Sequence, residues 1–233
     1  MKIKAGFFCF CLSLTFLGCK KDTGMAPAIQ SQSAPVYGEL SVQFTMTNWT
    51  SGVDTSAHAD FFGLPYSGSG AYPAGVDAGT VQFNNSALAQ SSPPGTYYPG
   101  GSLNFSNRSW SVSGSPVIPA FRYDQTALAI PVFSGYNLLP NVIKKAGFTV
   151  PLKGISNATA IVVSVSYAAT NINKTVSVND TSVTFTLSEL SALPITPNGY
   201  LIVDIVNEKK VNFGGKDFSF ENTYSYQWNI PIQ

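Results

Sequence analysis

The sequence predicts an all-β chain that holds two tandem β-sandwich regions. Apolar and polar residues alternate with a period of two along most of the chain, as in half-buried strands. Its 20 Gly and 15 Pro gather mainly between the alternating stretches, where they exclude long helices. Cys9, Cys11 and Cys19 are the three cysteines, so the predicted sandwiches must be stabilised by core packing rather than by disulfides.

Residues 1–18 are predicted to be a signal peptide that ends directly before a lipidated Cys19. A short basic start is followed by a largely apolar run over residues 5–17 and by the small residue Gly18. This run is shorter than the roughly 20 residues that a membrane-spanning helix needs. The letters F-L-G-C at positions 16–19 resemble the bacterial lipobox, with Phe where that motif usually has Leu. The resemblance implies cleavage after Gly18 and acylation of Cys19; an ordinary signal peptide is the alternative.

Residues 19–36 are predicted to be the lipidated cysteine and a flexible tether, because the stretch has little hydrophobic content and two prolines. Lys20-Lys21-Asp22 resembles the export signal that follows the cysteine in surface lipoproteins of Bacteroidota. Lysines beside a lipid anchor also suit anionic headgroups, and both interpretations stay open.

Residues 37–123 are predicted to be an N-terminal β domain with long loops. The clearest strand covers residues 40–46, and shorter ones are expected at 81–83, 103–105, 110–112 and 121–123. The stretches 63–79 and 91–101 are rich in Gly and Pro and are expected to be loops.

Residues 124–233 are predicted to form the second sandwich. Strands are expected at residues 148–152, 160–167, 175–178, 183–187, 200–206, 218–220 and 224–230. Asn179-Asp180 is expected to be a tight hairpin turn, Gly214-Gly215 a second one, and residues 188–193 one helical turn with Ser188 as its N-cap.

The stretch from Leu187 to Tyr200 resembles the E–F corner of fibronectin type III and immunoglobulin-like domains. The resemblance implies an immunoglobulin-like sandwich in which a leucine fills the core and the Tyr200 hydroxyl bonds back to the loop. A loop followed by a strand that happens to begin with Tyr is the alternative. The whole layout resembles Bacteroidota lipoproteins with tandem β domains, which implies an anchor and an architecture but no activity.

The residues that carry most chemistries are scarce. His58 is the one histidine, and a Ser-His-Asp arrangement would have to use it with Asp54 or Asp60, although the sequence has no G-x-S-x-G; we expect a surface residue. Zinc lacks ligands, calcium loops are missing, and Asp77 reads as a solvated loop residue, so no metal and no cofactor are expected. Asp204 interrupts an apolar run and is expected on a sheet surface.

Four tyrosines in the expected loops are the candidate ligand contacts: Tyr66, Tyr72, Tyr97 and Tyr98. Loop tyrosines are rigid, amphipathic contact surfaces, but they also anchor long loops against a core. A net charge of +1 gives no basic field for nucleic acid. We therefore expect a lipid-anchored, non-catalytic binding or structural module of the cell envelope, held to the outer membrane on its periplasmic or surface face. The expected partners are the membrane and a glycan or an envelope protein. A glycan-binding lipoprotein of a polysaccharide-capture system is the alternative, followed by a carbohydrate-active enzyme with two facing carboxylates.

Overall fold

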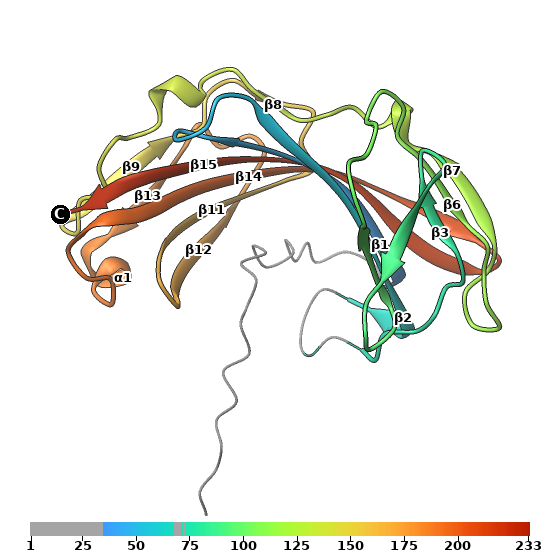
Figure 1. Cartoon of the computed structure of the whole chain (residues 1–233). Helices are drawn as coiled ribbons and strands as arrows, with labels where there is room; N and C mark the ends of the chain where they lie inside the picture. Colours follow the sequence, from blue (N-terminus) through green and yellow to red (C-terminus); the bar gives the residue numbers. More distant parts are fainter. Residues whose placement is uncertain (1–34, 68–70, 72) are drawn as a thin grey trace, which may run out of the picture.

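A computed structural model describes residues 35–67, 71 and 73–233. Strands account for 57 % of the chain and helices for 5 %, which confirms the all-β prediction. Eleven of the described strands form one sheet in the order β12-β11-β14-β15-β1-β2-β5-β4-β3-β6-β7, and the pairs β10-β8 and β13-β9 form two small sheets. Figure 1 shows the long sheet bent into an arch, with β14 and β15 running along most of its span.

The first part of the chain supplies the following strands: β1 (Val36–Thr47), β2 (Val53–Tyr66), β3 (Val81–Phe83), β4 (Ser86–Gln90), β5 (Thr96–Pro99), β6 (Ser109–Val112) and β7 (Phe121–Asp124). The second part supplies β8 (Val132–Phe133), β9 (Gly147–Pro151), β10 (Ile155–Ser156), β11 (Ala160–Tyr167), β12 (Thr170–Val176), β13 (Ser182–Thr186), β14 (Thr196–Phe213) and β15 (Lys216–Ile232). Short helical turns lie at Gln125–Ala127, Tyr136–Leu138 and, as α1, at Leu187–Leu190.

The β14–β15 hairpin connects the two halves of the molecule. Gly214 and Gly215 form its two-residue turn with φ of 56° and 80°, a conformation that favours glycine, and this confirms the expected turn. The strands expected at residues 200–206, 218–220 and 224–230 are segments of β14 and β15. In both strands, side chains continue to alternate between the two faces of the sheet through the polar stretches, so each strand is much longer than the apolar stretches alone predicted.

Two hydrophobic cores lie on the same face of the long sheet. In β15, Phe218 and Phe220 enter the first core, while Tyr226, Ile230 and Ile232 enter the second, and all five have the same parity along the strand. The first core consists of Leu40, Val42, Ala57, Ala59, Phe61, Ala78, Val81, Phe83, Leu88, Tyr97, Trp110, Val112, Ile118, Phe121, Leu128, Phe218 and Phe220. The second consists of Phe133, Leu139, Ile143, Val150, Leu152, Ile161, Val163, Val165, Val183, Phe185, Leu190, Leu193, Leu201, Val203, Ile205, Tyr226, Ile230 and Ile232.

The two cores are closed in different ways. At the first, the long sheet folds over itself, so that Phe121 of the edge strand β7 stacks on Phe213 of β14 with ring centroids 4.5 Å apart. At the second, Val150 of β9 and Phe185 of β13 form a separate layer over the long sheet. Both predicted sandwich-like regions are present, and one sheet serves both.

A buried polar network marks the junction between the cores. Gln125 and Asn222 are fully buried, and Gln125 Nε2 donates to Asn222 Oδ1 at 3.0 Å. Trp110 Nε1 donates to Gln125 Oε1 at 2.6 Å, and Asn222 Nδ2 donates to the Leu128 carbonyl at 2.7 Å. The chain crosses between the cores here, next to the boundary expected between residues 123 and 124. Phe218 and Phe220 follow this boundary in the sequence but pack in the first core, because the β14–β15 hairpin spans both cores.

Several predictions for the first part were wrong. Residues 53–66, where no strand was expected and where the predicted loop 63–79 begins, are strand β2, and their polar residues lie on the second, polar side of the sheet. The tyrosines at 97 and 98 lie on strand β5 rather than in a loop. Residues 103–105 are not a strand; Leu103 and Phe105 pack from a loop against the first core.

The turn at Asn179-Asp180 does not close a hairpin. It lies between β12, which pairs with β11 in the long sheet, and β13, which pairs with β9 in the small one. The helical turn begins earlier than predicted, because Thr186 rather than Ser188 is the N-cap and forms a capping box with Glu189. Tyr200 is 36 % exposed on the side of β14 opposite the second core, and its hydroxyl makes no hydrogen bond to the described residues, so the bond back to the loop that the resemblance implied is not formed.

Candidate functional site

The side of the long sheet that faces away from both cores carries most of the ionisable side chains of its central strands. We call this side the polar face. The register places Glu208 of β14 opposite Glu221 of β15, and Glu39 of β1 opposite Asp60 of β2. Together with neighbouring side chains these residues form what we call the ionisable cluster: Glu39, His58, Asp60, Glu208, Lys210 and Glu221.

His58 is the centre of a hydrogen-bonded chain that crosses three strands. Its Nε2 lies 2.8 Å from Asp60 Oδ2, and its Nδ1 lies 3.1 Å from Ser41 Oγ. Thr96 Oγ1 donates to Asp60 Oδ1 at 2.6 Å. Burial alone would lower the pKa of His58, but the hydrogen bond and charge of Asp60 and the charge of Glu39 outweigh it and raise that pKa. Burial acts to raise the pKa of Asp60, but the bonds from His58 and Thr96 lower it.

The neighbouring glutamates have the opposite behaviour. Burial, with the like charge of Asp60, raises the pKa of Glu39 to about 7. Burial, with the like charges of Glu39 and Glu208, raises the pKa of Glu221 to about 8. Ser219 Oγ donates to Glu208 Oε1 at 2.8 Å, and Lys210 Nζ lies 3.9 Å from that oxygen. The cluster therefore changes its protonation close to neutral pH. No group of three His, Cys, Asp or Glu side chains with the geometry for a metal ion occurs in the described ranges.

The Ser41–His58–Asp60 chain has the residue types of a catalytic triad but lacks its surroundings. The expected Ser-His-Asp partner Asp60 is brought to His58, whereas Asp54 is exposed near the start of β2. Ser41 lies in the middle of β1, which pairs with β15 on one side and β2 on the other. Its backbone N–H and those beside it are used in these ladders, so they are not available as an oxyanion hole.

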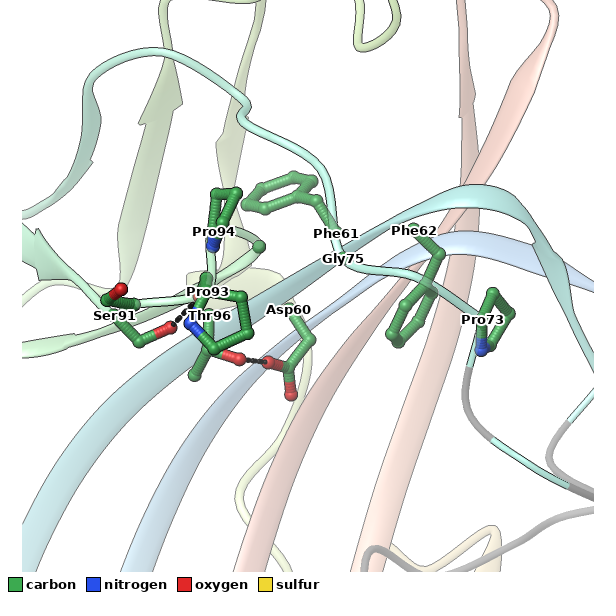
Figure 2. Close-up of a pocket in the computed structure, with 11 residues that line it drawn as sticks. Asp60, Phe61, Phe62, Pro73, Gly75, Ser91, Pro93, Pro94 and Thr96 are labelled. Atoms are coloured by element: carbon green, nitrogen blue, oxygen red, sulfur yellow. Dashed lines mark hydrogen bonds between the residues drawn. The ribbon is translucent and has the colours of Figure 1, made fainter.

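A pocket of about 460 Å³ opens beside Asp60 (Figure 2). Its walls are largely apolar and come from Phe61, Phe62, Pro73, Pro93 and Pro94, while Asp60, Thr96 and Ser91 supply polar atoms. This volume and this mixture of many apolar and few polar groups are typical of small-molecule sites. The pocket lies where the end of the ionisable cluster meets the segments around Gly75 and Gly95.

The tyrosines predicted to bind a ligand are not brought together on the surface. Tyr66 is 4 % exposed and packs on Phe62, with ring centroids 5.4 Å apart. Tyr97 is 2 % exposed, and its hydroxyl donates to Asp77 Oδ1 at 2.9 Å, so it anchors the segment before β3. Tyr98, of opposite parity on β5, is 42 % exposed. Tyr72 lies outside the described residues, as do Gly18 and Cys19.

Of two aspartates considered from the sequence, Asp204 differs from its predicted surroundings and Asp77 does not. Asp204 is on the polar face but only 5 % exposed, and its Oδ1 has no hydrogen-bond partner among the described residues. Burial raises the pKa of Asp204 to about 6, against a hydrogen bond from Ser225 that lowers it. Asp77 is an exposed loop residue, as predicted, and it also accepts a hydrogen bond from the Gly79 N–H at 2.8 Å.

Sequence reasoning missed Glu39, Ser41, Glu208 and Glu221. Each has the strand parity opposite to that of the core residues, which places it on the polar face, but only the pairing of β15 with both β14 and β1 brings them together.

The chain matches no family model and no curated protein. Among the described residues, no helix is long and apolar enough to cross a membrane.

Proposed function

We propose that this chain is a lipid-anchored, non-catalytic binding module of the cell envelope, and that its ligand occupies the pocket beside Asp60. The observation that carries the proposal is the pocket itself. It joins a largely apolar wall of Phe and Pro residues to one carboxylate whose orientation is fixed by His58 and Thr96.

The chemistry of the pocket indicates the kind of ligand. The lowered pKa of Asp60 keeps its carboxylate charged at neutral pH, and each of its oxygens retains a lone pair beyond its present bond. A ligand that presents an amine or a hydroxyl to Asp60 and an apolar body to the accessible prolines Pro73, Pro93 and Pro94 satisfies both features. Charge-assisted hydrogen bonds of this kind are about twice as strong as neutral ones.

A panel of primary amines, amidines and polyols, screened by ligand-observed NMR against the chain from residue 35 onward, tests this pocket. Hits should lose affinity by at least tenfold with Asp60→Asn and keep it with Asp54→Asn, an exposed aspartate of the same strand. If hits bind the Asp60→Asn protein as they bind wild type, the ligand site lies elsewhere.

The anchor is part of the proposal and has its own test. The stretch that ends at Cys19 supports cleavage and acylation, and the tether up to residue 36 would hold the sheet away from the lipid surface. In a bacterial host, wild type and Cys11→Ser should carry a diacylglycerol-type mass and fractionate with membranes, whereas Cys19→Ser should not. A Cys19→Ser protein that still fractionates with membranes would exclude this anchor.

A second candidate is a carbohydrate-active enzyme, because Glu39 and Asp60 are neighbouring carboxylates with pKa values shifted in opposite directions. Binding is favoured because neighbouring strands hold the two side chains side by side, about 5 Å apart at Cβ, on one face of a sheet. Glycosidase carboxylates flank the scissile bond from two sides. Release of nitrophenol from nitrophenyl glycosides, abolished by Glu39→Gln, would establish the enzyme instead.

A further inference from the structure

The turn between β1 and β2 presents an aromatic side chain that the cores do not use. Trp49 is 51 % exposed, whereas Trp110 is 1 % exposed. Its ring packs edge-on against Tyr200, with centroids 6.0 Å apart and planes at 76°, and Tyr200 is itself 36 % exposed. An exposed pair of large aromatic rings forgoes the stabilisation that burial would bring, which marks it for another role.

The turn is held rigidly by hydrogen bonds. Asn48 Nδ2 donates to the Asn229 carbonyl at 3.0 Å, and the Asn229 N–H donates to Asn48 Oδ1 at 2.9 Å. The Thr50 N–H donates to Thr47 Oγ1 at 3.1 Å. Trp49 is thus presented by a preorganised loop, and a ligand that stacks on it does not have to order that loop first.

Asn48, Trp49, Tyr200 and Asn229 line a hollow of about 360 Å³, which we call the aromatic hollow. The side-chain amide of Asn229 makes no hydrogen bond to the described residues, and the Asn48 amide keeps one N–H and one lone pair. All four side chains are uncharged. Aromatic faces next to amides that both donate and accept match a sugar ring, which has an apolar C–H face and hydroxyls at its edge.

We propose that the aromatic hollow binds a pyranose ring of a neutral oligosaccharide, with the ring stacked on Trp49 and its hydroxyls bonded to the Asn48 and Asn229 amides. This site is separate from the pocket beside Asp60 and does not depend on it: it uses the turn before β2, whereas the pocket uses the segments at Gly75 and Gly95. The hollow lacks the Lys and Arg side chains that attract anionic lipid, and its polar groups lie beside the rings, which favours a sugar over a membrane surface.

Isothermal titration of the chain from residue 35 onward with cellohexaose, laminarihexaose, xylohexaose and maltohexaose tests the site. At least one should bind with a Kd of about 1 mM or tighter, which is about −4 kcal/mol. Trp49→Ala should weaken this binding at least tenfold, and Tyr200→Ala about threefold. Trp49→Phe, which keeps an aromatic face, should retain most of it.

Tyr98→Ala, at an exposed tyrosine away from the hollow, and Asp60→Asn, in the pocket, should leave sugar binding unchanged. If Asp60→Asn still binds the sugar, the aromatic hollow acts independently of the pocket on which the proposed function rests. The inference is overturned if none of the four sugars binds up to about 10 mM, or if Trp49→Ala binds them as wild type does. Binding of wild type to phosphatidylcholine vesicles, lost with Trp49→Ala and without any sugar binding, would instead make Trp49 a membrane contact.

Discussion

The first core is rich in aromatic side chains, whereas the second is built mainly from aliphatic ones, although the same two strands run through both. In the first, the sheet folds over itself and brings into contact the rings of Phe61, Phe121, Phe213 and Phe218. In the second, Val163, Val203 and Ile205 meet a separate layer. One face of a sheet can therefore be covered either by strands from the far end of the same sheet or by a separate second sheet. Both arrangements occur here because the continuous β14–β15 hairpin presents its apolar residues to the same face along its whole length.

The polar face shows the same division. Beside the first core it carries the ionisable cluster and the pocket, whereas beside the second it carries the neutral aromatic hollow. Because both sites stand on strands that also build the cores, loss of the shared hairpin should disturb the whole molecule.

The largest effect is expected from Phe218→Ala at the tip of the hairpin. The side chain is fully buried and contacts the rings of Phe61 and Phe121. Its removal should cost about 3–5 kcal/mol of unfolding free energy. Urea unfolding followed by tryptophan fluorescence and by circular dichroism should give one shared transition at lower urea. A transition confined to the fluorescence of Trp110, with the strands of the second core retained, would show that the cores unfold separately. Leu138→Ala, at a 61 % exposed site, is the control.

The next effect concerns the polar junction. Asn222→Leu leaves Gln125 Nε2 without one acceptor and the Leu128 carbonyl without its 2.7 Å donor, both in a buried place. We expect a loss of about 2–3 kcal/mol. Asn207→Leu removes a 2.8 Å bond to the Ala129 carbonyl at an exposed site and should cost less than about 1 kcal/mol. Equal costs for the two variants would mean that the junction adds nothing to either core.

The ionisable cluster should make stability fall as pH rises. The folded-state pKa values of Glu39 and Glu221, about 7 and about 8, lie above their ordinary value of 4.5. Their stabilisation is therefore fully present below about pH 4.5 and is lost as pH rises through 7 to 8; the raised pKa of His58 acts in the same direction. The lowered pKa of Asp60 has the opposite effect, because its stabilisation is lost as pH falls, but this loss occurs only below its ordinary pKa of 3.8.

Thermal melts at pH 5.5 and pH 8.5 check this dependence, with a higher Tm expected at pH 5.5. Each kcal/mol corresponds to about 2–4 °C for a chain of this size. Glu221→Gln should reduce the difference between the two Tm values. A wild-type Tm that rises from pH 5.5 to pH 8.5 contradicts the assignment of the cluster.

The smallest effect is expected at α1, which covers the second core. Thr186→Ala removes the capping box with Glu189 while leaving Leu190 in the core, and should cost about 1 kcal/mol. Chemical denaturation of Thr186→Ala beside Ser188→Ala, which retains the N-cap, measures it. A larger loss of unfolding free energy with Ser188→Ala than with Thr186→Ala would show that Ser188 is the N-cap instead.

Much of the fold was predictable from alternation alone. Leu40 to Met46, Ala160 to Tyr167 and the glycine turn at 214–215 match β1, β11 and the long hairpin. Strand β2 was not predicted because its first half is polar on one side, and on the other side its buried residues are only the small Ala57 and Ala59. Small residues bury little area, so they give a weak hydrophobic signal even in a central strand.

The candidate sites were less predictable, because they depend on pairings between distant segments. Glu39 and Glu221 meet only through the parallel pairing of β1 with β15, which no local pattern indicates. Tyr66 and Tyr97 lie in sequence stretches rich in Gly, Pro and Ser, which are typical of loops, but both side chains are buried on strands. Trp49 lies in a short turn, and the Asn and Ser residues around it indicate a loop without indicating a site.

The central claim is that one sheet, with a shared hairpin, builds both cores. The most direct test is the amide NMR spectrum of residues 37–123 expressed alone, beside that of residues 35–233. Without β15 the fragment lacks a partner for β1 and the side chains of Phe218 and Phe220, so its amide signals should collapse into the narrow range of an unfolded chain. A dispersed spectrum with cooperative unfolding would contradict the account and make residues 37–123 an independent domain.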